Sequence, residues 1–260
     1  MTDINKATLP NQSSEKLLTL IEVLSQQDEP IRLQDLAKKL SMNASTVLRF
    51  LTSLQKKDYV AQDANTDRYY LTYKICGIAN NITSRTSIRH ICMPYLRSIS
   101  QIFGESANLS IEQNMMVVYI EVVNGPNQLL TTTQRIGNIA PMHCTGVGKL
   151  FLTNYTQRQL EQFTALKGMQ IFTENTLTTL DELAAEIETA KNRGYAFDNE
   201  ECEVGVRCVA APIRNYTKSV VAGLSVSGPT TRMTDELIYS KLSFLLDAAK
   251  EISTRLGYQP

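Results

Sequence analysis

The sequence predicts an α+β protein in two parts, a small helical part followed by a larger part in which antiparallel strands alternate with helices. Three observations support this prediction. Apolar residues recur with the period of amphipathic helices through residues 17–54. Beyond residue 105 the period changes to two, which is typical of half-buried strands. Turn-forming segments such as EQN and NGPNQ separate the strand-like runs and indicate an antiparallel meander.

The composition is that of a globular protein, because the 260 residues are 43% hydrophobic and 26 Lys and Arg balance 26 Asp and Glu. No apolar run approaches the roughly 18 residues of a membrane span, and the first residues lack the apolar core of a signal peptide. The five cysteines include no CxxC pair. We therefore expect a cytoplasmic protein with no membrane partner. Because the net charge is zero, any nucleic-acid partner must be argued from local geometry.

The first part is expected to form three helices and a hairpin. The expected ranges are a disordered tail over 1–12, a helix that starts at Ser13 or Ser14, helices over Leu33–Leu40 and Ala44–Lys57, and strands over Tyr59–Gln62 and Tyr69–Tyr73. Ser13 and Ser14 are capping residue types, and Asn43 is a suitable N-cap after the polar break SMN.

Three helices with a tight break between the second and the third, followed by a hairpin, are the outline of a winged helix-turn-helix. The third helix keeps its apolar residues on one face and presents Ser45, Thr46 and Arg49 on the other. Short hydrogen-bonding side chains and an Arg on a slim helix suit base edges in a DNA major groove. The alternative is an ordinary surface helix with a solvated polar face. In the hairpin, Arg68 is a candidate phosphate contact.

The second part begins after a linker. Tyr73–Phe103 is expected to form one or two helices that are interrupted near Met93 and Pro94. The elements expected beyond it are strands over Ser106–Ile111, Met115–Val123 and Leu129–Arg135, helices over Gly148–Leu152, Gln157–Leu166 and Leu180–Arg193 with Gly194 as C-cap, a hairpin of Arg207–Arg214 and Ser219–Ser227, and a helix from Thr234 that buries Leu242, Leu245, Leu246, Ala249 and Ile252.

Candidate chemistry concentrates in residues 141–152, 198–213 and 224–232. A phosphate loop would need Gly at position 143 and Ser or Thr at position 150, where the chain has His143 and Leu150, so a nucleotide-binding loop is excluded. Glycines immediately before a helix let backbone N–H groups approach an anion, which predicts capture of a small carboxylate there.

Two groups of reactive residue types leave alternatives open. The first suits a Cys–His nucleophile pair, a tetrahedral zinc site or simply buried thiols, and consists of His143, Cys144, Cys202 and Cys208. Neighbours in an extended segment point to opposite faces, which argues against the nucleophile pair. The second group suits a metal or acid–base cluster or a solvated loop, and consists of Asp198, Glu200, Glu201 and Glu203. Asp198 follows the apolar Phe197 and is the member expected to point inward.

Taken together, these motifs resemble those of the IclR family of transcriptional regulators. The segments PMHCTGVGK, DNEECEVGVRCVAAP and SVSGPTTR are similar to the effector domain of that family, and LAKKLSMNASTVLRFLTSLQKKDYV is similar to its helix-turn-helix. The resemblance runs from about Glu15 to Leu256. The chain departs from the family pattern at Ser41, Asp67 and Thr72, where glycine is usual.

The resemblance implies a winged helix-turn-helix, a linker helix and a GAF-like effector-binding domain with an antiparallel sheet and flanking helices. The implied boundaries are 1–12 for the tail, 13–74 for the DNA-binding domain, 75–104 for the linker helix region and 105–260 for the effector-binding domain. The DNA-binding residues are taken as Asn43, Ser45, Thr46, Arg49 and Arg68. The effector-binding residues are taken as Gly146, Val147, Asp198, Val206, Cys208, Ser225 and Ser227.

The function implied is that of a ligand-responsive regulator, more often a repressor, of catabolic genes. It would bind operator double-stranded DNA as a homodimer or as a tetramer that is a dimer of dimers, and its effector would be a small organic or sugar acid. We expect no catalytic residue, metal or cofactor. One alternative is a small-molecule enzyme with a Cys-based site at Cys144 or Cys208, and another is a protein-interaction module. Salt-dependent binding to a palindromic duplex would distinguish the first function from both alternatives.

Overall fold

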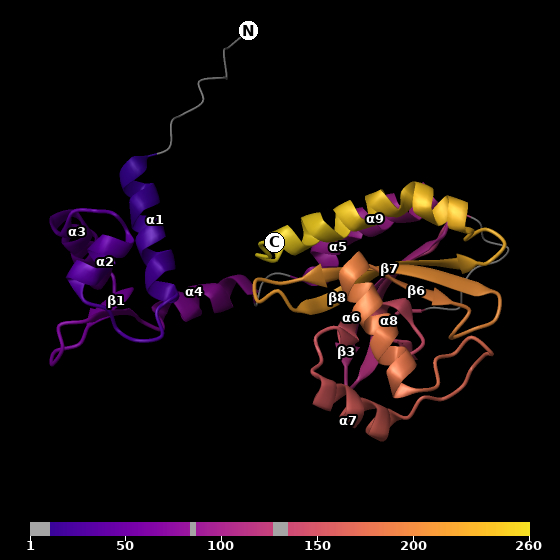
Figure 1. Cartoon of the computed structure of the whole chain (residues 1–260). Coiled ribbons are helices and arrows are strands. Elements are labelled where there is room, and N and C mark those ends of the chain that lie inside the picture. The colour runs from indigo at the N-terminus through magenta and orange to yellow at the C-terminus, as the bar shows by residue number, and fades with distance from the viewer. Residues whose placement is uncertain (1–10, 84–86, 127–134) are drawn as a thin grey trace, which may run out of the picture. The chain divides into compact units, whose positions relative to one another are not determined.

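A computed structural model of the chain describes residues 11–83, 87–126 and 135–260 (Figure 1). The chain divides into two compact units, Met1–Thr86 and Ser87–Pro260, and each unit has its own hydrophobic core. Within the described ranges, no helix is long and apolar enough to cross a membrane.

The N-terminal unit has the winged helix-turn-helix arrangement that the sequence predicts. Its described elements are α1 (Gln12–Ser25), α2 (Leu33–Lys39), α3 (Ala44–Gln55), β1 (Val60–Gln62), β2 (Tyr69–Leu71) and α4 (Lys74–Thr83). The apolar sides of α1, α2 and α3 meet in one core, where Leu20, Leu36 and Val47 are fully buried. The strands β1 and β2 pair antiparallel and pack on the same core through Val60 and Tyr69.

The N-cap predicted for the first helix is wrong. Asn11, rather than Ser13 or Ser14, caps α1, because its Oδ1 accepts hydrogen bonds from the backbone N–H of Ser13 at 3.0 Å and of Ser14 at 3.4 Å. An Asn side chain satisfies the free N–H groups of a first turn as well as a serine does. Asn43 is the N-cap residue of α3 as predicted, although its side chain makes no capping hydrogen bond.

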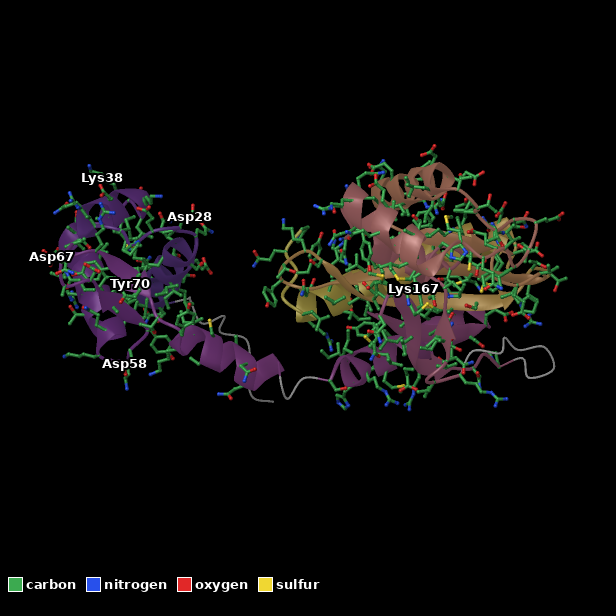
Figure 2. The ribbon with its side chains drawn as sticks, turned by 90° about the horizontal axis from the view of Figure 1, so that it is seen from below. Asp28, Lys38, Asp58, Asp67, Tyr70 and Lys167 are labelled. Atoms are coloured by element: carbon green, nitrogen blue, oxygen red, sulfur yellow. The ribbon has the colours of Figure 1, made fainter. Side chains whose placement is uncertain are left out.

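Two positions where glycine is usual in the family have a left-handed backbone in this chain. The angle φ is 51° at Ser41, between α2 and α3, and 55° at Asp67, in the turn between β1 and β2. Figure 2 shows Asp67 at the periphery of the N-terminal unit. Within the turn, Asp63 Oδ1 accepts hydrogen bonds from the N–H groups of Asn65 at 3.0 Å and Thr66 at 2.8 Å. Side-chain hydrogen bonds thus help to form the hairpin without a glycine.

The linker interruption predicted at Pro94 is also wrong. Helix α5 (Ile88–Phe103) contains Pro94 in its interior, and residues 84–86 between α4 and α5 lie outside the described ranges. A proline inside a helix costs roughly 3 kcal/mol. However, α5 buries a row of apolar side chains that includes Leu96 and Phe103 against the sheet of the C-terminal unit, at about 1.5–3 kcal/mol for each. This burial outweighs the cost of the proline.

The C-terminal unit is built on an antiparallel sheet whose described strands have the order β5-β4-β3-β8-β7-β6. The strands are β3 (Ser106–Gln113), β4 (Met116–Val123), β5 (Ile139–Ala140), β6 (Ala196–Asn199), β7 (Val206–Arg214) and β8 (Val220–Pro229). The strands β3 and β8 lie in the middle, so their residues are covered on both faces. A register shift between Leu109 and Ser110 marks a bulge where β3 pairs with β4.

Helices cover both faces of this sheet (Figure 1). The remaining helices are α6 (Gly146–Leu152), α7 (Gln157–Lys167), α8 (Leu180–Arg193) and α9 (Asp235–Arg255). Helices α5 and α9 pack on one face, where Leu224 and Val226 of β8 point. Helix α6 packs on the opposite face, with α8 and α7 beyond it. The α+β fold predicted from the sequence is therefore confirmed.

Most elements predicted for the C-terminal unit are present, with small differences at their ends. Helix α8 follows a capping box at Thr179 and ends at Gly194 in the left-handed conformation, as predicted. Helix α6 begins two residues earlier than predicted, because Thr145 caps it. The strands β5 and β6 were not predicted. The strand predicted over Leu129–Arg135 lies outside the described residues, except for Arg135.

The last helix buries most of its predicted residues. Thr234 caps α9, and its hydroxyl accepts a hydrogen bond from the Leu237 N–H. Leu245, Ala249 and Ile252 are buried as predicted, whereas Leu242 and Leu246 are only partly buried at the edge of the same core.

Candidate functional site

Helix α3 presents a polar face to solvent in the N-terminal unit. Ser45 and Arg49 are exposed and Thr46 is half-buried, whereas Val47 and Leu51 on the opposite side are fully buried. The predicted N-cap residue of the same helix, Asn43, is exposed as well. These side chains are therefore available to a ligand, and none of them is needed for the core.

Arg68 lies differently from the other predicted DNA contacts. Its Nη1 is 3.5 Å from the Pro30 carbonyl oxygen and 3.9 Å from Glu29 Oε2. Its Nε is buried without a hydrogen-bond partner in the described part of the chain. The guanidinium is thus half-buried against the loop before α2. A phosphate contact by Arg68 stays a prediction.

The second candidate site is a buried polar face of the sheet, on the side covered by α6. Strand pairing places Asp198, Cys208 and Ser227 opposite one another in one row. Ser225 and Asn108 lie opposite each other in the next row. Side chains directly opposite in a sheet have Cβ atoms about 5 Å apart, so these five residues form one continuous surface. Each of them is at most 8% exposed.

Hydrogen bonds connect this polar face. Asn108 Nδ2 donates to Ser227 Oγ at 3.2 Å, and the hydroxyls of Ser225 and Ser227 hydrogen-bond the Cys208 thiol. Burial raises the pKa of that thiol to about 12, so it stays protonated at neutral pH. The half-buried Val206 begins the strand two residues before Cys208 and lies on the same face. The strands thus bring together five of the seven predicted effector residues.

The other two predicted effector residues belong to α6, which packs closely on this face because of two glycines. A Cβ on Gly146 would lie 3.3 Å from Ala210 Cβ, and a Cβ on Gly223 would meet Val147 Cγ1 at 2.2 Å. Ala210 is the partner of Ser225 in the sheet. The first backbone N–H groups of α6 therefore lie next to the polar face. Such groups have no partner within their helix, so they suit an anion.

Asp198 is buried at the end of the polar face and is held by the loop that follows it. Its Oδ1 accepts hydrogen bonds from the N–H of Glu201 at 2.8 Å and of Cys202 at 3.3 Å. Burial raises the pKa of Asp198 to about 7, although these two hydrogen bonds lower it. Near neutral pH the carboxyl group is therefore divided between its protonated and ionised forms. The protonated form does not repel an acid ligand and can donate a hydrogen bond to it.

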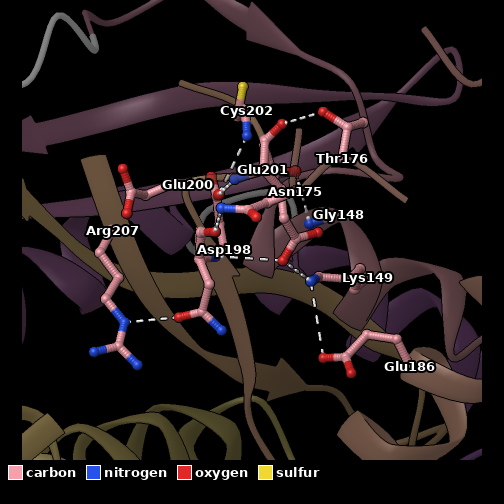
Figure 3. A network of polar contacts seen from close by, with 12 residues as sticks. Gly148, Lys149, Asn175, Thr176, Glu186, Asp198, Glu200, Glu201, Cys202 and Arg207 are labelled. Carbon is pink, nitrogen blue, oxygen red and sulfur yellow. Dashed lines mark hydrogen bonds and ion pairs between the residues drawn. The ribbon is translucent and has the colours of Figure 1, made fainter. Parts of the chain in front are cut away.

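A buried ion pair adjoins Asp198 (Figure 3). Lys149 of α6 is 1% exposed, and its Nζ lies 2.6 Å from Glu201 Oε1 and 3.8 Å from Glu186 Oε1 of α8. Glu201 Oε1 also accepts the Asn199 N–H at 3.3 Å. Burial raises the pKa of Glu201 in spite of the attraction of Lys149. The pair ties α6 to the loop that holds Asp198.

The acidic segment is only partly the solvated loop that the sequence allowed. Glu203 is exposed, but Asp198 and Glu201 are both 6% exposed, and Asp198 belongs to strand β6. Glu200 Oε2 accepts the Gly205 N–H at 2.7 Å and closes the turn before β7. The prediction that Asp198 points inward is confirmed.

Sequence reasoning missed three buried polar residues near this site. Lys149 carried a signal, because a lysine in the otherwise apolar helix GVGKLFL indicates a buried partner. Asn108 and Ser110 carried none, since polar residues that alternate along a strand normally mark its solvent face. Here that face is covered by α6 and the segments around it.

The cysteines and His143 have separate partners. His143 Nε2 lies 3.0 Å from the Gln170 carbonyl oxygen, whereas the Cys144 thiol hydrogen-bonds Cys202. That hydrogen bond and burial raise the pKa of Cys144, which keeps it protonated. His143 and Cys144 therefore do not form a nucleophile–base pair. In the part of the chain that the structure describes, no three His, Cys, Asp or Glu side chains are grouped to hold a metal ion.

Comparison with known families matches both units. Residues 80–254 match the family described as the bacterial transcriptional regulator IclR C-terminal domain. Residues 13–64 match the IclR helix-turn-helix domain. The two matches together span most of the chain and follow the order of the two units.

Individual relatives match over nearly their whole length. The chain is 30% identical over 258 residues to the HTH-type transcriptional regulator KdgR of Escherichia coli K12, covering 98% of this chain and 97% of that protein. It is 29% identical over 248 residues to the acetate operon repressor of Salmonella typhimurium LT2, covering 95% and 90%. The crystal structure of the Thermotoga maritima IclR is similar with a TM-score of 0.63 and 29% identity, covering 95% of this chain and 99% of that chain.

Proposed function

The chain belongs to the IclR family of bacterial transcriptional regulators, and from this membership we propose that it represses catabolic genes and responds to a small organic or sugar acid. One relative is named as the repressor of an acetate operon. The observation that carries the proposal is the presence, in one chain, of an exposed polar face on α3 and a buried polar face beside α6. The first face suits DNA, and the second suits a small polar ligand.

On the DNA side, we assign base contacts to Ser45, Thr46 and Arg49. An Arg that projects from a recognition helix pairs well with guanine, and Ser or Thr hydroxyls bind base edges or phosphates. Asn43 and Arg68 are assigned to the phosphate backbone. The protein acts in the cytoplasm as a homodimer or as a tetramer that is a dimer of dimers. A two-fold dimer would read half-sites about 34–36 Å apart, which is one turn of DNA.

On the effector side, we assign the carboxylate of the acid to the backbone N–H groups of Gly146 and Val147. The rest of the acid contacts the polar face, namely Asp198, Val206, Cys208, Ser225 and Ser227. We assign this site to binding rather than to catalysis, because the Cys208 thiol stays protonated at neutral pH.

The proposal is tested by fluorescence anisotropy with a labelled duplex taken from the DNA upstream of the chain's own gene. We expect binding that weakens steeply with salt and that changes about tenfold when the effector is added, which corresponds to about 1.4 kcal/mol of coupling. A Ser225→Ala, Ser227→Ala double variant should keep its affinity for DNA and lose the response. The matched control is Ser240→Ala, Ser243→Ala, which alters two exposed serines of α9.

Two outcomes would contradict the proposal. Salt-insensitive or absent binding to every duplex would remove the role in DNA binding and favour an interaction module. A double variant that responds at the same acid concentration as the wild type would place the effector elsewhere. Light scattering of the protein–DNA complex tests the oligomeric state, and a single protomer on the full operator would exclude the dimer.

A further inference from the structure

Strand β3 places two unpaired polar atoms on the buried polar face. Asn108 and Ser110 are both 0% exposed. Asn108 Oδ1 and Ser110 Oγ have no hydrogen-bond partner in the described part of the chain. Buried polar atoms are nearly always hydrogen-bonded in native proteins, because an unpaired one is destabilising. Two such unpaired atoms, on residues that are neighbours along one face of the strand, therefore indicate a role other than stability.

Their position continues the proposed effector site. Asn108 lies opposite Ser225 and donates to Ser227, so it directly adjoins two of the assigned residues. Ser110 lies opposite Gly223, whose missing side chain leaves the space that Val147 fills. Residues two apart along a strand point to the same face. The two free atoms thus extend the polar face from β8 onto β3, next to the N-terminus of α6.

We propose that Asn108 and Ser110 form a specificity subsite that binds a hydroxyl group of the effector, an inference that rests on the proposed function. Asn108 Nδ2 already donates to Ser227, so the free Oδ1 requires a donor. A ligand hydroxyl donates to Asn108 and accepts from Ser110 at the same time. A keto or carboxylate oxygen only accepts, so it leaves Oδ1 unpaired.

The subsite also restricts the position of the hydroxyl group on the ligand. Ala210, which lies beneath Gly146, is two strands away from Asn108, or about 9.6 Å at 4.8 Å per strand. Hydrogen bonds of about 2.8 Å at the two ends leave about 4 Å between the carboxylate oxygen and the hydroxyl oxygen of the ligand. At about 1.5 Å per bond, about three bonds span this distance, and two of them are carbon–oxygen bonds. The hydroxyl group therefore lies on the second or third carbon of the acid, and the effector class is a 2- or 3-hydroxy acid or a sugar acid.

The test is calorimetric binding to the full chain with matched acids that differ in hydroxylation. The probes are butanoate against 3-hydroxybutanoate, and hexanoate against gluconate. We expect the wild type to prefer the hydroxylated member of a pair by about tenfold, which one hydrogen bond to a buried group can supply. Asn108→Leu and Ser110→Ala should each reduce this preference to about twofold or less.

A buried serine on the other side of the sheet provides the control. Ser100 of α5 is 2% exposed, and its Oγ donates to the Asn124 carbonyl oxygen at 3.2 Å. Ser100→Ala should lower the melting temperature of the unliganded protein and keep the hydroxyl preference. Ser110→Ala should not lower that melting temperature, because the Ser110 hydroxyl makes no hydrogen bond that could be lost. This second measurement remains informative if Asn108→Leu fails to fold.

Several other outcomes would each refute the proposed subsite. A Ser110→Ala variant that keeps the hydroxyl preference, or a wild type that binds both members of each pair equally, removes the subsite and leaves the effector site intact. A lower melting temperature for unliganded Ser110→Ala shows that the hydroxyl has a structural partner, which also removes it. If the wild type binds none of the four acids, the proposed effector class fails together with the subsite.

Discussion

Replacing Asp198 by Asn is expected to reduce the pH dependence of the stability of the C-terminal unit. Asn has nearly the same shape as Asp, and its Oδ1 can still accept the hydrogen bonds from the N–H groups of Glu201 and Cys202. The substitution therefore removes the charge and preserves the local contacts. What changes is the free energy of burying an ionised carboxylate.

The size of the effect follows from the pKa of this carboxyl group. Burial raises the pKa of Asp198 from 3.8 to about 7, and a difference of about 3 units corresponds to about 4 kcal/mol. Because the native state binds the proton more tightly than the unfolded state does, wild-type stability should fall as the pH rises from about 4 to about 7. The variant has no carboxyl group at this position, so this fall in its stability does not occur. It should equal the wild type near pH 4 and exceed it by up to about 4 kcal/mol at pH 8.

Differential scanning calorimetry of the full chain between pH 4 and pH 8 measures this difference. For a domain of 150–250 residues, 1 kcal/mol shifts the melting temperature by about 2–4 °C, so the variant should melt up to about 8–16 °C higher at pH 8. Asp247→Asn, which alters an exposed Asp of α9, is the control and should follow the wild type. Two outcomes would refute the reasoning that burial dominates the pKa of Asp198. One is parallel curves of melting temperature against pH for Asp198→Asn and the wild type, and the other is a variant that is less stable than the wild type at pH 8.

Three further predictions concern DNA contact, backbone strain and the buried ion pair. Arg49→Ala should weaken operator binding in anisotropy by about 1–3 kcal/mol per half-site without changing the melting temperature, because Arg49 is exposed; unchanged sequence preference would contradict its role. Ser41→Gly should raise the free energy of unfolding of the N-terminal unit by about 1 kcal/mol in urea titrations, and Asp67→Gly by less, because Asp tolerates the left-handed conformation better; a destabilised Ser41→Gly would argue against strain. Lys149→Met should lower the free energy of unfolding of the C-terminal unit by about 3–5 kcal/mol in urea titrations, and Glu201→Gln in the same chain should restore most of it; a double variant no better than the single would exclude the pairing.

Local signals explain why most helices were predictable from the sequence. Helix α8 begins and ends where Thr179 and Gly194 place it, because a capping box and a left-handed C-cap act within a few residues. The predictions of secondary structure are wrong where contacts between residues distant in the sequence determine the structure. Pro94 remains inside α5 because the sheet supplies a surface for that helix to cover. Strand β6 was missed because the segment around Asp198 has the charge density of a loop, and only pairing with β7 shows it to be a strand.

The same reasoning applies to the buried polar face. The predicted effector residues Cys208, Ser225 and Ser227 do lie together, because antiparallel pairing brings alternate residues of neighbouring strands side by side. Their burial was not predictable from composition, since it depends on the position of α6. Asn108 joined them only through the register of β3 on β8, which no local signal specifies.

The alternation along the central strands has a consequence for changing what the protein senses. On β8, Ser225 and Ser227 face the polar side, whereas Leu224 and Val226, which alternate with them, face α5 and α9. Except for Gly223, which lets α6 pack closely, the proposed ligand-binding residues and the residues of the core under α5 and α9 therefore alternate along these strands. A variant library that changes only the serines and their polar neighbours can alter which ligand the protein binds. Truncating a residue of the other side, such as Leu224 to Ala, lowers the free energy of unfolding by about 2–5 kcal/mol. Ligand preference can accordingly differ between relatives of this fold with little loss of folding stability.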